Sequence, residues 1–573
     1  MTYHALHCIV AQVKTEPSIT ISAAPVISRQ KLDVIMCALV SSGAAKPLKN
    51  GKKSMKSEWR GLLRGVSGVS ILVAMGLTGC TVGPDFQSPA APKASGYTST
   101  ALKGTVSADI AGGGGQTFAY GADVPGEWWT LFHSKQINAF VAESIANHPN
   151  LEAAQATLRQ ARELADADAG GFFPSASASI GGTRQRVPPA ASPTGRARFY
   201  NLYNTNVPVS YSPDVFGKVA RTTEADEAAA DNARFELEAA YLSLTANVVT
   251  AAINDASYAE QIKVTQDIIN AQKQQVDLLE RQFQLGAVGQ ADVLSEKAQL
   301  AQTLATLPPL QKLRAQGRNQ LMALLGRLPG QDRGESVSLA QLNLPRSLPV
   351  SLPSKLVRQR PDIQAAEAQM HQASAKIGVA TANMLPQITL SAAAGTEALK
   401  PDKLFLAQSA ALSAGASAAA PIFDAGTLYH DREASQAAYD AAQAQYRSTV
   451  ITAFQNVADA LRAVQADAAT LKAEVDAENT SSDSLNIARA QFSAGSTTFQ
   501  TVLTAEQTLL TAKVNRARAQ AARYADSAAL FQAVGGGWWN RIDETPASMP
   551  KPMDPVDNIP LVAGIRAATA DKK

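Results

Sequence analysis

The sequence is poor in the residues that build disulfide-linked, zinc-binding or nucleic-acid-binding proteins. Three cysteines among 573 residues cannot form a disulfide framework or a four-cysteine zinc site. Aromatic residues make up 6% of the chain, and alanine is common in its second half, which suits long packed helices better than a β-sandwich. Lysine and arginine total 52 against 49 acidic residues, and this net charge of +3 is too small to indicate a nucleic-acid partner.

Catalytic and cofactor-binding motifs are also missing. The sequence holds no HExxH, GxSxG or GxxxxGK[ST] pattern. The histidines after residue 80 are scattered without metal-ligand spacing: His133, His148, His371 and His430. We therefore predict no enzyme activity, no cofactor and no metal, and we expect the chemistry of this protein to be passage rather than bond-making.

No apolar run reaches the roughly 18–20 residues of a membrane-spanning helix. The longest, residues 66–77, follows Lys56, Arg60 and Arg64 and leads into Leu77-Thr78-Gly79-Cys80. A basic region, an apolar region and a terminal Leu-Thr-Gly-Cys are typical of a bacterial lipoprotein signal. We predict that residues 55–79 are removed and that Cys80 is lipidated, for example with palmitate.

Charge and composition support removal of the N-terminal segment before Cys80. Residues 1–79 carry ten basic and three acidic residues, a net of +7, which leaves 42 basic and 46 acidic residues, a net of −4, for 80–573. Residues 1–54 match no targeting pattern, and we treat them as an uninterpreted extension or a mis-assigned start. Val82 stands where an inner-membrane retention signal has aspartate, which favours the outer membrane. The Pro/Ala/Gly-rich residues 80–130 read as a tether or surface strap.

Two long segments repeat at a constant spacing. Pro149 and Pro361 are each followed 25 residues later by a second proline, a shift of 212. Farther on, Gly217 matches Gly426 and Gly286 matches Gly495, a shift of 209. A long period with almost no slippage predicts an internal duplication. The first copy covers 131–345, the second covers 354–540, and 541–573 form a tail.

Each copy predicts the same series of elements. A helix comes first, at about 136–168 and 354–382. Two weakly alternating stretches follow, at 175–186 and 200–212 and at 387–398 and 408–420; each is long enough for a tilted membrane-spanning strand. Next, residues 218–285 and 427–494 hold neither glycine nor proline. Each would form a helix about 100 Å long. Return helices follow at 291–327, bent at Pro308-Pro309, and at 499–534.

The strand interpretation has a physical consequence. Four strands cannot close a barrel, and unpaired strand edges in lipid cost several kcal/mol for each backbone group. If these strands enter a membrane, several chains must share one barrel. A lipid-anchored periplasmic coiled-coil scaffold without a pore remains open as an alternative.

At this point the residues resemble a known family, the TolC-type outer-membrane factors of tripartite pumps, and more narrowly the NodT-like lipoproteins of resistance-nodulation-division efflux systems. The resemblance covers about 80–540. Its marks are Cys80-Thr-Val-Gly-Pro-Asp-Phe86, Trp128-Trp-Thr-Leu-Phe132, Asp214-Val-Phe-Gly217, Leu307-Pro-Pro-Leu310, Pro421-Ile-Phe-Asp-Ala-Gly426 and Gly535-Gly-Gly-Trp538.

The resemblance implies a mainly α fold with a β membrane part. It implies a homotrimer with a twelve-stranded β-barrel in the outer membrane and an α-helical tunnel in the periplasm, which a periplasmic adaptor and an inner-membrane pump engage. The implied function is a passive exit duct for drugs and other toxic compounds. A type I protein-secretion duct is the alternative from the same fold.

The resemblance also implies roles for residues at the two turns. The tips that an adaptor would grip are Leu285, Gly286 and Ala287 in the first copy and Ala494, Gly495 and Ser496 in the second. Just past them, Asp292 matches a gating aspartate, although a helix N-terminal carboxylate explains it equally well. Thr501 and Thr504 stand where aspartates often occur, and Thr497 where an arginine can. We therefore expect a constriction held by packing, with Val502 and Leu503 as candidates. The pairs Trp128-Trp129 and Trp538-Trp539 are expected to pack at the tunnel's waist rather than to anchor a membrane belt.

Overall fold

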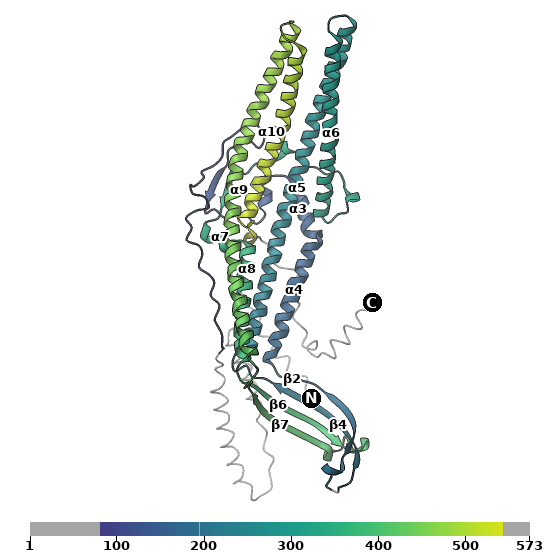
Figure 1. Ribbon diagram of the computed structural model, residues 1–573, viewed down its shortest axis with the longest axis vertical. Coiled ribbons are helices and arrows are strands. Elements are labelled where there is room, and N and C mark those ends of the chain that lie inside the picture. Colours follow the sequence, from purple (N-terminus) through teal and green to yellow (C-terminus); the bar gives the residue numbers. More distant parts are fainter. Residues whose placement is uncertain (1–80, 194, 542–573) are drawn as a thin grey trace, which may run out of the picture. The chain divides into compact units, whose positions relative to one another are not determined.

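Two helical hairpins dominate the computed structural model, which describes residues 81–193 and 195–541 (Figure 1). Helix α5 (Lys218–Gln284) and α6 (Gln290–Leu324) form the first hairpin, and α9 (Thr427–Ser493) and α10 (Phe499–Ala533) form the second. The segments without glycine and proline are therefore continuous helices of 67 residues each, as predicted. Helix α6 also continues through Pro308 and Pro309.

The shorter helices are broken where we expected each to be continuous. The first is divided into α3 (Lys135–Asn147) and α4 (Pro149–Ala169), and its counterpart into α7 (Pro353–Gln359) and α8 (Pro361–Asn383). The reason is the residue before each proline, because His148 and Arg360 are extended, with ψ of 119° and 124°. Proline disfavours the helical conformation in its predecessor and then begins the next helix.

The strands gather into one antiparallel sheet with the order β3-β4-β6-β7. They are β3 (Ser179–Val187), β4 (Arg198–Tyr211), β6 (Gln387–Ala398) and β7 (Ala410–Ala419), and the short β2 (Ser175–Ala176) also pairs with β4. Both predicted strand pairs therefore form, and β4 joins β6 although the two strands are far apart in the sequence. Helix α5 begins seven residues after β4 ends, so the turn at the end of α5 lies about 100 Å of helix away from the sheet.

The hydrophobic core lies where the hairpins pack against the shorter helices. Trp128 is fully buried there and stacks on Phe531, with ring centroids 5.4 Å apart. Trp129 is buried beside it, and Trp538 and Trp539 are half-buried. The tryptophan pairs therefore pack within the helical part, as predicted. A small parallel sheet of β1 (Thr117–Tyr120) and β5 (Ser347–Val350) covers this core.

No helix within the described ranges is both long enough and apolar enough to cross a membrane.

Candidate functional site: the sheet, the hairpin tips and the seam below them

The two faces of the sheet differ in polarity. The register places six large exposed apolar side chains on the same face, which we call the apolar face: Ile180, Phe199, Val207, Val209, Leu390 and Leu412. The opposite, polar face presents hydroxyl and amide groups: Thr183, Gln185, Asn204, Asn206, Ser391 and Ser413. This dyad pattern is the one found in strands that face lipid on one side and an aqueous lumen on the other.

The sheet is open at both ends in the described part of the chain. Strands β3 and β7 each pair on one side, with β4 and β6 respectively. Every residue of β7 is exposed. An edge of ten exposed residues beside an apolar face is a template for pairing with another chain.

The beginning of the described chain is held against the junction between sheet and helices. The Arg221 guanidinium donates to the carbonyl oxygen of Val82 at 3.1 Å and to Asp85 at 2.6 Å. Gly83 packs so closely on Gly378 that a Cβ on Gly83 would lie 2.4 Å from the Gly378 Cα. Side chains at either glycine would therefore disturb this attachment. Cys80 itself lies outside the described residues and directly precedes the attached segment in the sequence.

Both hairpin tips are closed by the same backbone turn. Ala287 N donates to Gln282 O, and Gly286 N to Phe283 O; Ser496 N and Gly495 N repeat the pattern toward Gln491 and Phe492. These pairs define Schellman motifs, which require a left-handed residue. Gly286 and Gly495 supply it with φ of +76° and +71°. An added Cβ at either glycine would meet nothing within 4 Å, so both tips present accessible backbone.

The gate candidates just past the tips lie in different environments. The Asp292 carboxylate accepts from Gly289 N at 3.3 Å and so caps α6. Thr501 and Thr504 are exposed, and Thr501 accepts a hydrogen bond from the Thr497 hydroxyl. Val502 and Leu503 are buried with residues of both hairpins in one apolar cluster, which also contains Leu279, Val293, Leu485, Ala488, Phe499 and Leu509.

A buried carboxyl group lies in the same part of the hairpins, and the sequence analysis did not identify it. Glu296 on α6 is fully buried, and neither carboxylate oxygen has a hydrogen-bond partner among the described residues. Burial and, to a lesser extent, nearby Glu506 raise the pKa of Glu296 to about 7, against the opposing effect of Arg489. Arg489 on α9 pairs with Glu506 on α10 at 2.7 Å. We call these three residues the seam, because Glu296 of the first hairpin lies near the Arg489–Glu506 pair of the second. Nothing in the local sequence of α6 predicts that Glu296 is buried.

The seam predicts a pH-dependent contact between the hairpins. Glu296 binds a proton more tightly when the hairpins are packed than when they are apart. Protonation of Glu296 therefore stabilises the packed state fully below pH 4.5, and this stabilisation is lost as the pH rises through about 7. The pKa of Glu296 is about 7 in the packed state and 4.5 when the carboxyl group is free in water. By linkage, the equilibrium constant for opening the α6–α10 contact should therefore increase about tenfold between about pH 6 and about pH 8. Hydrogen exchange of residues 290–300 and 499–507, corrected for intrinsic rates, measures this change.

Glu296→Gln should make the exchange nearly independent of pH over the same interval. The matched control is Glu280→Gln, which removes a half-exposed partner of Lys297 on the same hairpin and should keep the wild-type dependence. A Glu296→Gln protein that still responds to pH as the wild type does would contradict the role of this carboxyl group.

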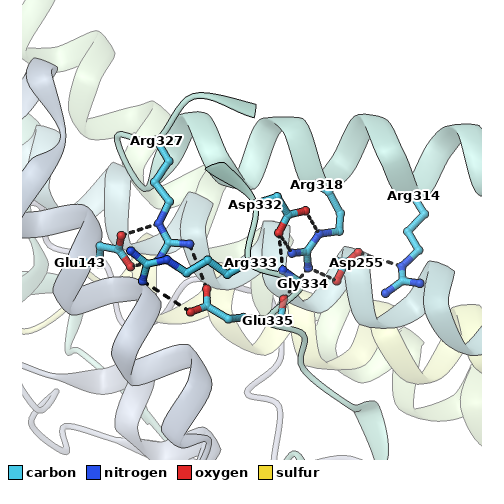
Figure 2. A network of polar contacts seen from close by, with 9 residues as sticks. All are labelled: Glu143, Asp255, Arg314, Arg318, Arg327, Asp332, Arg333, Gly334 and Glu335. Carbon is cyan, nitrogen blue, oxygen red and sulfur yellow. Dashed lines mark hydrogen bonds and ion pairs between the residues drawn. The ribbon is translucent and has the colours of Figure 1, made fainter. Parts of the chain in front are cut away.

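A second polar network lies at the level of α3 and connects α5, α6 and the segment after α6 (Figure 2). Buried Asp255 accepts from Arg314 and Arg318, at 3.2 Å each. Arg318 also binds Asp332, and this hydrogen bond lowers the pKa of Asp332 to about 2. Arg327 extends the network to Glu143 on α3 and to Glu335. Because Arg318 and Arg327 each bridge two elements, the network holds the base of the first hairpin rigid.

Asp255→Ala should destabilise the protein by about 3 kcal/mol, because buried Arg318 loses one of its two carboxylate partners and half-exposed Arg314 loses its own. Thermal unfolding of the purified protein in detergent measures the loss. Asp476→Ala removes the exposed partner of Lys472 and should cost less than about 1 kcal/mol. Equal unfolding temperatures for the two variants would show that the Asp255 pairs do not hold this region together.

Comparison with known proteins identifies the family. The outer membrane efflux protein family model matches residues 141–327 and 352–536. The toluene efflux pump outer membrane protein TtgF of Pseudomonas putida is 29% identical over 82% of this chain and 97% of its own length. Nodulation protein T of Rhizobium leguminosarum bv. viciae is 28% identical over 69% of this chain and 77% of its own.

A solved structure agrees with these relatives. The outer-membrane channel OprN matches with a TM-score of 0.73 and 28% identity, over 80% of this chain and all of that one. The chain therefore belongs to the outer membrane efflux protein family, whose members are transport components of efflux pumps with adaptor and inner-membrane parts. It is an outer-membrane protein and the exit duct of a tripartite pump.

Proposed function

We propose that this duct passively conducts small toxic molecules, such as drugs, from the periplasm to the exterior. The two-faced sheet is the observation that carries the proposal, because its polar face suits an aqueous lumen and its apolar face suits lipid. Relatives named for toluene efflux support small molecules rather than secreted proteins as cargo. No nucleic acid, cofactor or metal has a part in this function.

The duct works as a homotrimer in this proposal. The sheet of β3, β4, β6 and β7, with the short β2 also on β4, has two open edges, and lipid cannot satisfy the backbone groups that those edges expose. Pairing β7 of one copy with β3 of the next removes every edge when the arrangement closes. Three copies would supply twelve strands, a barrel wide enough for an aqueous lumen. The two copies of the repeated unit, at 131–345 and 354–540, would contribute one strand pair and one hairpin each.

The tips are the proposed docking points for the periplasmic adaptor of an inner-membrane resistance-nodulation-division pump. Both turns have accessible backbone, and Leu285 adds an apolar side chain that is 84% exposed. They lie about 100 Å of helix from the sheet, where a partner from the inner membrane would reach them. Opening would separate the tips from their neighbours, with Asp292, Thr501, Val502, Leu503 and Thr504 at the constriction.

Lipidation of Cys80 would anchor the mature chain. Thr81, which follows Cys80 directly, lies next to Gly217 at the junction of sheet and helix, so an anchor here would suit the membrane end of the helices. Mass spectrometry of the purified protein should show an acylated N-terminal Cys80. A chain that begins at Met55 without lipid would refute this. One acyl chain binds membranes weakly, so Cys80→Ser should slow insertion without preventing it.

Single-channel conductance in planar bilayers tests the proposed function. Purified protein should insert as a trimer by native mass spectrometry and should open steps of reproducible conductance. A stable monomer without channel activity would favour a periplasmic scaffold instead.

A further inference from the structure

A pair of arginines lies on the apolar face of the sheet, at the end farthest from the helices. Arg184 and Arg186 alternate with Gln185 along β3, so both share the face of Ile180 and Phe199. Their register partners on β4 are Asn201 and Phe199. Both side chains are exposed.

The two guanidinium groups gather around one aromatic ring. The Cζ atoms of Arg184 and Arg186 lie 5.8 and 5.9 Å from the centroid of Phe199, within cation–π range. None of the ion pairs in the described ranges involves either arginine. Two cations without a protein counter-ion, on a face that otherwise suits lipid, need an anionic partner from outside the chain.

The strand hairpin of residues 175–213 carries charge of one sign only. Residues 175–213 contain four arginines and no acidic residue or lysine, whereas residues 387–420 of the second hairpin contain two lysines and two acidic residues. The first hairpin therefore carries +4 and the second no net charge. The positive charge is thus a property of one place on the sheet and not of its strands in general.

The pair also lies at the expected height for a lipid head group. From Tyr211 to Phe199 the apolar face spans 13 residues, about 40 Å of strand, which a tilt of about 40° reduces to about 30 Å along the membrane normal. The apolar band of such sheets is about 25 Å tall and is flanked by aromatic residues. Tyr211 therefore marks the edge beside the helices, and Phe199 with its arginines marks the outer edge.

We propose that Arg184 and Arg186 form a binding site for the phosphate of an outer-leaflet glycolipid whose acyl chains lie against Phe199 and Ile180. Guanidinium groups bind phosphate oxygens in pairs, and residues i and i+2 of a strand are about 7 Å apart, which lets one phosphate contact both. The proposal rests on the proposed function, because it needs the apolar face to lie in the outer membrane.

The test measures how much lipid A the purified trimer retains, by native mass spectrometry after exchange into detergent that contains a fixed amount of lipid A. The Arg184→Gln, Arg186→Gln double variant should retain at least about fivefold less than the wild type, as the loss of two charge-assisted contacts predicts. The matched control is Arg196→Gln with Arg198→Gln, which loses the same charge from the same hairpin. Arg198 is paired with Val187 and therefore lies on the other face. The control should retain lipid as the wild type does.

A second measurement uses the wild-type protein alone. Enzymatically dephosphorylated lipid A should bind at least about fivefold more weakly than the phosphorylated form, because it cannot pair with the guanidinium groups. Equal retention of the two lipids, or equal losses in the two double variants, would overturn the phosphate site. Conductance measured on the same samples separates the two proposals: channels with unaltered lipid retention would overturn this site alone, and absence of channels would overturn the proposed function.

Discussion

Replacing Val207 with arginine should prevent stable assembly in the outer membrane. Val207 lies on the apolar face of β4 and is 47% exposed in the single chain. An arginine that faces lipid near the middle of a spanning strand costs about 2–4 kcal/mol, and a trimer would bear that cost three times. The expected result is loss of the trimer from isolated outer membranes, measured on unheated electrophoresis samples.

The neighbouring residue supplies the control. Asn206 lies on the polar face, so Asn206→Arg should assemble normally and shift the ion selectivity of the channel toward anions. Normal assembly of Val207→Arg together with failure of Asn206→Arg would invert the two faces of the sheet. If neither variant assembled, this part of β4 would accept no arginine on either face. The experiment would then give no support for a face of the sheet that contacts lipid.

Gly495→Glu should abolish efflux while the trimer persists. Gly495 closes the second tip in a left-handed conformation, and an added side chain there points into open space. A charged side chain would therefore obstruct an approaching partner without disturbing packing inside the chain. We expect normal amounts of trimer, loss of crosslinking to the adaptor, and drug susceptibility close to that of a strain without the duct.

The conformational strain of the substitution needs its own control. Any residue other than glycine costs about 1–2 kcal/mol in the left-handed region. Gly495→Ala shares this strain but adds only a methyl group, and should retain most of the efflux. Full drug resistance in a strain with Gly495→Glu would exclude docking at this tip. Loss of the trimer in both variants would show that the glycine serves only to form the turn.

The seam should make separation of the hairpin tips depend on pH. Glu296 lies about two turns into α6, so tip separation must break the contact that its protonation favours. The apolar cluster with Val502 and Leu503 and the Arg489–Glu506 pair meet at the same level. Val502 and Leu503 are buried in this cluster, and their place at a packed constriction stays a proposal. If the proposed gate lies here, apolar packing and charged groups would both contribute to it, although the threonines at 501 and 504 argued against charge.

Local signals in the sequence determined the long helices, the turns at their ends and the four long strands of the sheet. A run of 68 residues without glycine or proline can form a continuous helix of 67 residues, and a glycine at its end permits the left-handed turn that reverses the chain. The prolines at 149 and 361 were equally visible, yet they begin new helices rather than lie inside one. The conformation of the preceding residue decides this, and the apolar periodicity continues across the break.

Tertiary structure alone decided which residues meet. The weak alternation of each strand became a single apolar face only after β4 paired with β6 in one register, and a slip of one residue would have mixed the two faces. Asp255 meets arginines about 60 residues away, Glu296 approaches Glu506 across about 210, and Arg221 holds Asp85 across 136. The periodicity of one segment contains no information about its partner, because burial and pairing depend on the relative register of distant elements. The sequence therefore determined the parts of this duct, and packing between the parts determined where its charges are buried.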